Sequence, residues 1–160
     1  LLAFAFPLFM IVGFMGLYSF LKKQHHTPSL EIAYLFSIIG ASLVCTFLVI
    51  QQANFVWHSR AIEAAETEEA KGLLVAAFNG TNRVQLGMDV AWDIFILVAV
   101  LLFSWNIARS PSFNKILGLS GCLIAVLTLT FNLYTLPDPP SGSVIDIAPG
   151  IGVWIFIVYI

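Results

Sequence analysis

Charged residues are scarce in this chain: Asp, Glu, Lys and Arg together make up 10% of its 160 residues. Soluble domains carry about 25% charged residues, so a soluble fold of this length would lack the polar surface it needs. Basic residues are few, with seven Lys and Arg against nine Asp and Glu. Because phosphate binding needs a basic patch, the sequence argues against nucleic acid as a partner.

Cysteine and histidine are also rare. The two cysteines, Cys45 and Cys122, both fall inside apolar runs, so a disulfide framework is not indicated. None of the three histidines is spaced three or four residues from another within an apolar run, as zinc-protease and di-metal carboxylate sites require. Nucleophile-elbow and phosphate-loop patterns are missing as well. We therefore predict no catalytic residue, no metal site and no cofactor.

What the chain has instead is apolar sequence, with 59% hydrophobic residues and a mean hydropathy of +0.94. These residues form blocks long enough to cross a bilayer, which takes about 20 helical residues. Each block must be a helix, because unpaired backbone groups are too costly in hydrocarbon. The sequence predicts an all-α, polytopic transmembrane helical bundle that forms a single domain over 1–160. Its five visible spans lie at about 1–21, 30–57, 86–108, 116–136 and 147–160.

The longest connection between these segments is about 58–85. Within it, residues 60–71 read RAIEAAETEEAK, and Ala and Glu are strong helix formers. We predict an outward helical loop, which either lies at the membrane surface and folds back toward the bundle or is a plain solvated linker. The connection 137–143 is rich in proline and cannot be helical.

Basic residues near the ends of the segments predict the orientation. The first connection carries Lys22 and Lys23, and the third carries Arg109 and Lys115. Placing both in the cytoplasm puts the acidic connection 58–85 and the proline-rich connection on the outer side. Leu1 then begins an apolar run on the outer side, and the last segment is short for a span. One further span before Leu1, making six in the full chain, is the simplest completion.

Two carboxylates interrupt the apolar pattern of the third segment. Asp89 and Asp93 lie four residues apart and therefore share one helix face, whereas Trp92 points elsewhere. An ionised Asp at the centre of a transmembrane helix costs about 2.5–3.5 kcal/mol. Such a residue is expected to face the bundle interior and to have a polar partner.

Several polar groups at the outer ends of neighbouring segments are candidate partners for these carboxylates. They include Arg83, His58 and Asn132, along with Arg60, Gln51, Gln52 and Tyr134. One reading is a polar cavity for a proton, a cation or a small polar ligand, in which two like charges oppose each other's ionisation. The other reading is a hydrogen-bonded cluster that fixes helix packing.

Small residues at four-residue spacing predict close helix contacts, because helices in lipid associate by close packing. They occur in the second segment, at Ser37, Ala41 and Cys45, and in the fourth, at Gly118 with Cys122 and at Gly121 with Ala125. The first segment has Gly13 and Gly16.

Residues 89–136 read DVAWDIFILVAVLLFSWNIARSPSFNKILGLSGCLIAVLTLTFNLYTL, and IDIAPGIGVWIFIVYI follows after the proline-rich connection. This half of the chain resembles a broad group of uncharacterised bacterial multi-pass integral membrane proteins. An Asp-bearing helix, a short basic turn, a Gly-rich helix ending in Asn-Leu-Tyr and a final Gly-x-Trp helix recur in that group. The resemblance implies a bacterial inner-membrane protein of about six helices and implies no reaction.

Two functions follow from these patterns. The first is a non-enzymatic accessory or structural subunit that packs in the lipid bilayer against other membrane protein subunits. The alternative is a binding or transport protein for a small molecule, an ion or a proton that uses Asp89 and Asp93. A transporter is expected to show discontinuous helices or repeats, and only Pro7 hints at a break.

Overall fold

The computed structural model describes residues 2–135, which fold into four α-helices joined by three short connections. The helices are α1 (Leu2–Gln24), α2 (Pro28–Ala64), α3 (Glu68–Arg109) and α4 (Lys115–Thr135). Each is long and apolar enough to cross a membrane, and the chain is therefore a helical membrane protein. The predicted all-α class is confirmed, with four candidate spans among the described residues. The fifth predicted segment, 147–160, lies outside them.

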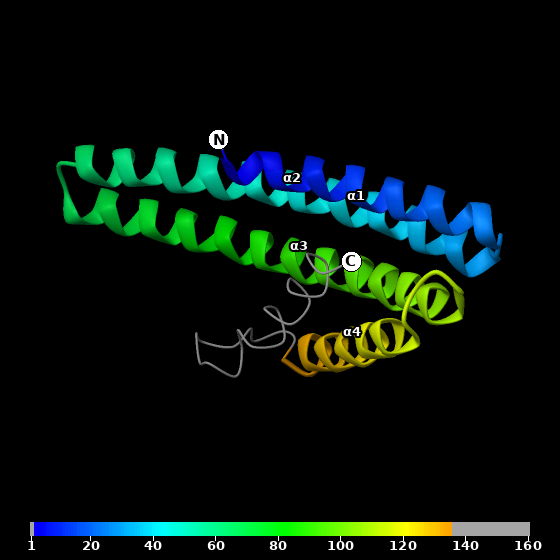
Figure 1. The fold of residues 1–160 in the computed structure, drawn as a ribbon. Coiled ribbons are helices and arrows are strands. Elements are labelled where there is room, and N and C mark those ends of the chain that lie inside the picture. The colour runs from blue at the N-terminus through cyan, green and yellow to red at the C-terminus, as the bar shows by residue number, and fades with distance from the viewer. Residues whose placement is uncertain (1, 136–160) are drawn as a thin grey trace.

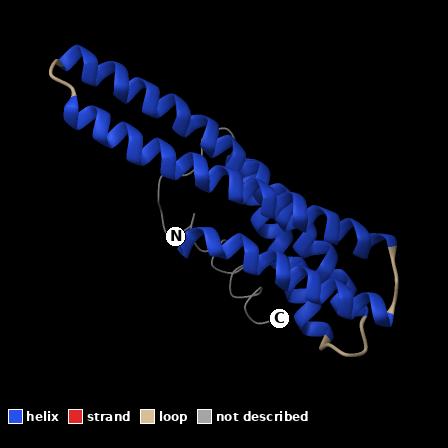
Figure 2. Ribbon diagram, turned by 90° about the horizontal axis from the view of Figure 1, so that it is seen from above, coloured by secondary structure: helices blue, strands red, loops and turns tan. Residues whose placement is uncertain are grey.

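The two central helices are much longer than a bilayer requires. At 1.5 Å per residue, the 37 residues of α2 and the 42 of α3 are about 55 and 63 Å long, against a hydrocarbon core of about 30 Å. They pack together as an antiparallel hairpin (Figure 1). The shorter α1 packs on α2 and α4 packs on α3, both beside the same half of the hairpin. The other half extends past them, as the view from above also shows (Figure 2).

This extending part, residues 51–85, is called the hairpin arm below. It corrects the prediction for the connection 58–85, which is not a separate surface helix. Residues 58–64 continue α2, and residues 68–85 already belong to α3. The Ala- and Glu-rich run 60–71 is also interrupted at 65–67. Helix propensity favoured a continuous helix there, but packing of α2 against α3 requires a turn.

Threonine side chains set where both long helices begin. Thr27 has extended backbone, and its hydroxyl accepts the Leu30 N–H at 3.2 Å, with Pro28 in the first turn of α2. Thr67 caps α3 in the same way, accepting the Ala70 N–H at 3.2 Å ahead of two glutamates. Acidic residues in a first turn are favourable because they face the positive end of the helix dipole.

Helices α3 and α4 approach each other closely at Gly118. A Cβ placed on Gly118 would sit 2.3 Å from the backbone nitrogen of Ala108, so only glycine permits this approach. In α2, Ser37 and Ala41 are buried, as the small-residue pattern predicted. Gly13 and Gly16 behave differently, because a Cβ on either would meet nothing within 4 Å. Their predicted close contact is therefore not made by residues 2–135.

The basic residues that predicted the orientation gather at one end of the bundle, which we call the basic end. Helix α1 ends here and α2 begins, while α3 ends and α4 begins. The contacts across this end join residues far apart in sequence, such as the Gln24 side chain, which accepts a hydrogen bond from the Ser110 hydroxyl. Lys22, Lys23, Arg109 and Lys115 therefore share one side of the bundle, and the hairpin arm lies at the other.

Candidate functional site

Asp89 and Asp93 lie on consecutive turns of α3, in the part of the helix beside the end of α4. Both side chains are half-buried. Asp93 accepts a hydrogen bond from the Asn132 amide nitrogen of α4 at 3.0 Å. The predicted pairing of an intramembrane carboxylate with an amide of the fourth segment is thus present. This hydrogen bond joins α3 to α4, between two residues that are 39 positions apart in the sequence.

Trp92 separates the two carboxylates in sequence and faces another helix, as predicted. Its ring lies 5.9 Å from that of Phe47 in α2, centroid to centroid. Trp92 thus contacts α2, whereas Asp93 is hydrogen-bonded to α4. Gln85, one turn before Asp89, is also buried, with 6% of its surface exposed. Sequence reasoning missed Gln85, although its four-residue spacing from Asp89 was the available signal.

Neither carboxylate has a basic partner within residues 2–135. The ion pairs in this part of the chain are Lys22–Glu31 and Lys71–Glu68, and a His26 ring nitrogen also lies 2.5 Å from Glu31. The same residues contain no group of three His, Cys, Asp or Glu side chains that could hold a metal ion. Two neighbouring carboxylates away from water disfavour joint ionisation, and they can share a proton or bind a cation.

His58 lies elsewhere, within the hairpin arm. It is buried, its Nδ1 is 3.0 Å from the carbonyl oxygen of Asn54, and its ring meets the Phe78 ring edge-on at 5.8 Å. Asn54 donates from its amide to the Phe78 carbonyl at 3.4 Å. Phe78 is eleven residues before Asp89, about 16 Å along α3. His58 therefore joins the two helices of the arm and does not reach the carboxylates.

Arg83 also stands apart from the carboxylates. Its side chain is exposed on α3, six residues before Asp89 and on a different helix face. Of the five candidate residues, the structure thus brings together Asp93 and Asn132, with Asp89 one turn away. It separates His58 from them by about 16 Å along α3, and it places Arg83 on another face of that helix.

A second polar cluster, at the basic end, centres on Asn106 of α3, which is fully buried. Its side-chain oxygen accepts from the Thr27 hydroxyl at 2.8 Å. Its nitrogen donates to the Ser29 hydroxyl at 3.1 Å and to the Leu102 carbonyl at 2.7 Å. This amide therefore fixes the start of α2 against the end of α3. Sequence reasoning missed it, and the signal was a lone Asn within an apolar run.

A third cluster surrounds Glu31 at the same end. Its carboxylate accepts from Tyr18 at 2.7 Å and from Lys22 at 3.0 Å, and it lies 2.5 Å from His26. Lys22 also donates to the Tyr18 hydroxyl at 2.6 Å. These groups are partly exposed and hold α1 to α2 across a connection of three residues. Sequence reasoning noted Glu31 only as a residue of a helix start.

Comparisons of this chain with protein-family models, with curated proteins and with solved structures find no match.

Proposed function

We propose that this chain is a non-enzymatic accessory or structural subunit of a membrane complex, and that it binds a partner helix through its hairpin arm. The observation that carries the proposal is an uncovered apolar stripe on α3. Leu73, Ala77, Gly80, Val84 and Gly87 are all exposed. The name arm stripe is used for these five residues.

The spacing of the arm stripe is that of a coiled-coil seam. Its members follow one another at intervals of four, three, four and three residues, which is the a/d pattern of a heptad repeat. Leu73 and Val84 are 69% and 61% exposed, with small residues between them. A Cβ on Gly80 or Gly87 would meet nothing within 4 Å. Small residues in a seam let a second helix approach closely.

The arm stripe is evidence for an interaction surface because the arm faces water. Seven of the chain's 16 charged residues lie in 51–85, and the exposed Trp57 near the base of the arm suits a membrane interface. The arm therefore extends from the interface into water. In lipid an exposed apolar side chain is ordinary, whereas a contiguous apolar stripe in water marks an interaction surface.

The polar groups of the bundle support a structural role. Asp93 is hydrogen-bonded to Asn132 between α3 and α4, and Asn106 to Thr27 and Ser29 between α3 and the start of α2. Each of these side chains serves helix packing. Buried polar networks of this kind specify one arrangement of helices, which suits a scaffold.

We also propose the setting. The gathering of Lys22, Lys23, Arg109 and Lys115 at one end supports a cytoplasmic basic end, with the arm on the outer side. The resemblance of the C-terminal half to bacterial multi-pass proteins supports a bacterial inner membrane.

The arm stripe is tested by photo-cross-linking in native membranes. A benzophenone amino acid at Leu73 or at Val84 is expected to give one adduct of defined mass. The same group at Asn79, which is exposed on another face of the arm, is expected to give none. The double substitution Leu73→Glu with Val84→Glu should abolish co-purification of that partner and leave the melting temperature unchanged, because both side chains are exposed.

Two results would contradict this proposal. An adduct of twice the chain's mass would identify the partner as a second copy and remove the accessory role. A protein that purifies from native membranes as a monomer, without adducts at either stripe position, would remove the interaction surface altogether.

A second candidate function is reversible binding of a proton or a cation by Asp89 and Asp93. The specific observation in its favour is that two half-buried carboxylates share a helix face without a basic partner among residues 2–135. In hydrocarbon such carboxylates are often functional.

This second candidate predicts a change in ion flux. The double substitution Asp89→Asn with Asp93→Asn removes both charges and keeps an amide able to pair with Asn132. We expect it to abolish proton or cation flux into liposomes that contain the purified protein, with the melting temperature retained. Glu31→Gln, at the other end of the bundle, is the control and should keep the flux. Equal flux in the wild-type and doubly substituted proteins would eliminate this function.

A further inference from the structure

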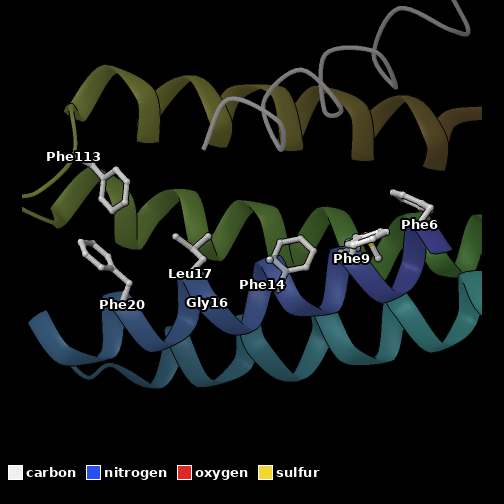
Figure 3. A pocket seen from close by; sticks show the side chains of 9 residues that line it. Phe6, Phe9, Phe14, Gly16, Leu17, Phe20 and Phe113 are labelled. Atoms are coloured by element: carbon white, nitrogen blue, oxygen red, sulfur yellow. The ribbon is translucent and has the colours of Figure 1, made fainter.

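An apolar groove runs along α1 on the side turned toward α3 and α4 (Figure 3). Its volume is about 530 Å³. Phenylalanines dominate its lining, with Phe6 near one end and Phe20 at the other, where Phe113 from the α3–α4 connection closes it. The ring centroids of Phe20 and Phe113 are 5.5 Å apart. The groove is thus an apolar surface whose Phe20 end lies at the basic end of the bundle.

The residues that line the groove differ in their exposure. Met10 and Phe14 are buried, and the Phe14 ring stacks on the Phe103 ring of α3 with the centroids 5.4 Å apart. Phe9, by contrast, is 75% exposed. One side of the groove is therefore held against α3, whereas residues 2–135 leave its other side open to molecules of the bilayer.

The two glycines of α1 deepen the groove near the basic end. Gly13 and Gly16 line it, both are exposed, and a Cβ added to either would meet no atom within 4 Å. At 1.5 Å per residue they lie about 11 and 6 Å along α1 from Phe20. One leaflet of the hydrocarbon core is about 15 Å deep. An acyl chain that enters at Phe20 would therefore pass both glycines, where no side chain obstructs it.

Two lysines lie at the Phe20 end of the groove. Lys23 continues the lining face of α1, since Gly16, Phe20 and Lys23 follow one another at intervals of four and three residues. Lys115 begins α4, two residues after Phe113. Both lysines are exposed, and they lie at the end of the bundle where the apolar span of α1 stops.

The positive charge of these two lysines is not balanced by residues 2–135. Neither Lys23 nor Lys115 forms an ion pair with them, whereas Lys22 is paired with Glu31 at 3.0 Å. Residues 2–30 and 94–115 contain no Asp or Glu. An apolar groove that ends at two ammonium groups is complementary to a molecule with an anionic head and an apolar tail. Basic pockets between membrane helices bind anionic lipid headgroups in this way.

We propose that the α1 groove binds one anionic phospholipid, with an acyl chain along Gly16 and Gly13 and the phosphate at Lys23 and Lys115. The proposed cytoplasmic placement of the basic end puts this headgroup in the leaflet that carries anionic lipids. A zwitterionic lipid has the same tails, but its own ammonium group offsets its phosphate, so the lysines favour the anionic lipid. The site does not depend on the arm stripe, which lies at the other end of the bundle.

Native mass spectrometry of the full chain, purified in detergent and titrated with phosphatidylglycerol or phosphatidylcholine, tests the charge requirement. The wild type is expected to bind one phosphatidylglycerol more tightly than phosphatidylcholine. Lys23→Gln with Lys115→Gln should weaken phosphatidylglycerol binding about 30-fold, since each lysine at a membrane surface contributes about fivefold. Arg60→Gln with Arg83→Gln removes the same charge from exposed positions of the arm and should keep the preference.

Gly16→Leu tests whether the tail lies in the groove. Its Cβ meets no atom of residues 2–135, so the four helices should tolerate a leucine that fills the groove. We expect phosphatidylglycerol to bind about tenfold more weakly than to Met15→Leu, because about two methylene groups of the tail are displaced. Met15 is exposed and does not line the groove. Glycerol phosphate, which has the head without the tail, should not compete.

Photolabelling of the unaltered protein keeps the test decisive if a variant fails to fold. In phosphatidylcholine liposomes, a phosphatidylglycerol with a diazirine in its acyl chain is expected to label residues 6–20, as mapped on peptides. Excess unlabelled phosphatidylglycerol should prevent this labelling, and excess phosphatidylcholine should not.

Several results would overturn the proposal. Equal affinity for the two lipids, or a preference that survives loss of both lysines, would show that no anionic headgroup is recognised. Equal binding by Gly16→Leu and Met15→Leu, labelling confined to other helices, or competition by glycerol phosphate would remove the tail from the groove. A benzophenone amino acid at Phe9 that couples in native membranes to protein and not to lipid would place a second copy or another protein segment there.

Discussion

Replacing Gly118 with Ala is expected to push α4 away from α3 and to lower the free energy of unfolding by about 1–3 kcal/mol, the usual cost of overpacking. The reason is geometric, because the new Cβ would lie 2.3 Å from the Ala108 nitrogen and 2.6 Å from its Cα. Both are backbone atoms of a long helix, which cannot rotate away as a side chain could. Relief requires movement of a whole helix.

The native Cys122 reports this movement. It lies one turn beyond Gly118, half-buried, with its sulfur 3.7 Å from the Leu101 carbonyl of α3. In a Cys45→Ala background, Gly118→Ala should speed the reaction of Cys122 with a thiol reagent and lower the melting temperature in detergent. Gly72→Ala is the matched control. Its Cβ meets no atom, so helix propensity should make it neutral or stabilising by at most about 1 kcal/mol. Equal stability of the two variants would contradict the close α3–α4 contact.

Replacing Asn106 with Ala is expected to destabilise the basic end by about 1–3 kcal/mol, the cost of leaving buried polar groups without partners. The amide makes three hydrogen bonds, to Thr27, Ser29 and Leu102, and is fully buried. Its loss also frees the Thr27 side chain that caps α2. The start of α2 would then be held less firmly against α3.

A double-mutant cycle isolates this effect. Asn106→Ala and Ser29→Ala are measured singly and together by unfolding in detergent, and the two should couple because they share a hydrogen bond at 3.1 Å. Asn79→Ala, at an exposed position of α3, is the control and should be close to neutral. Additive effects of Asn106 and Ser29, or an Asn106→Ala protein as stable as the control, would show that this network does not hold the helices.

Both variants concern interactions that helices in lipid need most. Without a hydrophobic driving force between them, such helices associate through close packing and interhelical hydrogen bonds. Gly118 supplies the first of these between α3 and α4, and Asn106 supplies the second between α3 and α2. The pair Asp93–Asn132 adds a further hydrogen bond at the far end of α4. These few, specific contacts of Gly118, Asn106 and Asp93 hold the helices together at both ends of the bundle.

The carboxylate site illustrates how far a sequence can specify a partner. The cost of a charge in hydrocarbon made Asp93 conspicuous, and the level of Asn132 in the fourth segment made it a reasonable partner. Both predictions needed only helix rise and bilayer thickness. His58 and Arg83 were proposed on depth alone. The structure places His58 against Asn54 and Phe78 in the arm, about 16 Å along α3 from Asp89, and Arg83 on another face of α3.

The sequence by itself determined that the chain is helical and crosses a membrane, because apolar runs of this length leave no other way to satisfy the backbone in lipid. Its small-residue spacing also predicted the close contact at Gly118, which the structure has, and one at Gly13 and Gly16, which residues 2–135 do not make. Only the tertiary structure decided that α2 and α3 continue past α1 and α4 as a hairpin arm. The composition of residues 60–71 favours helix but does not show where the chain reverses, and the two helices of the arm contact each other across a three-residue turn. The hydrogen bonds of Asn106 join it to residues that are 77 and 79 positions away in the sequence. Tertiary packing decided these contacts as well, because the sequence does not indicate which distant residues meet.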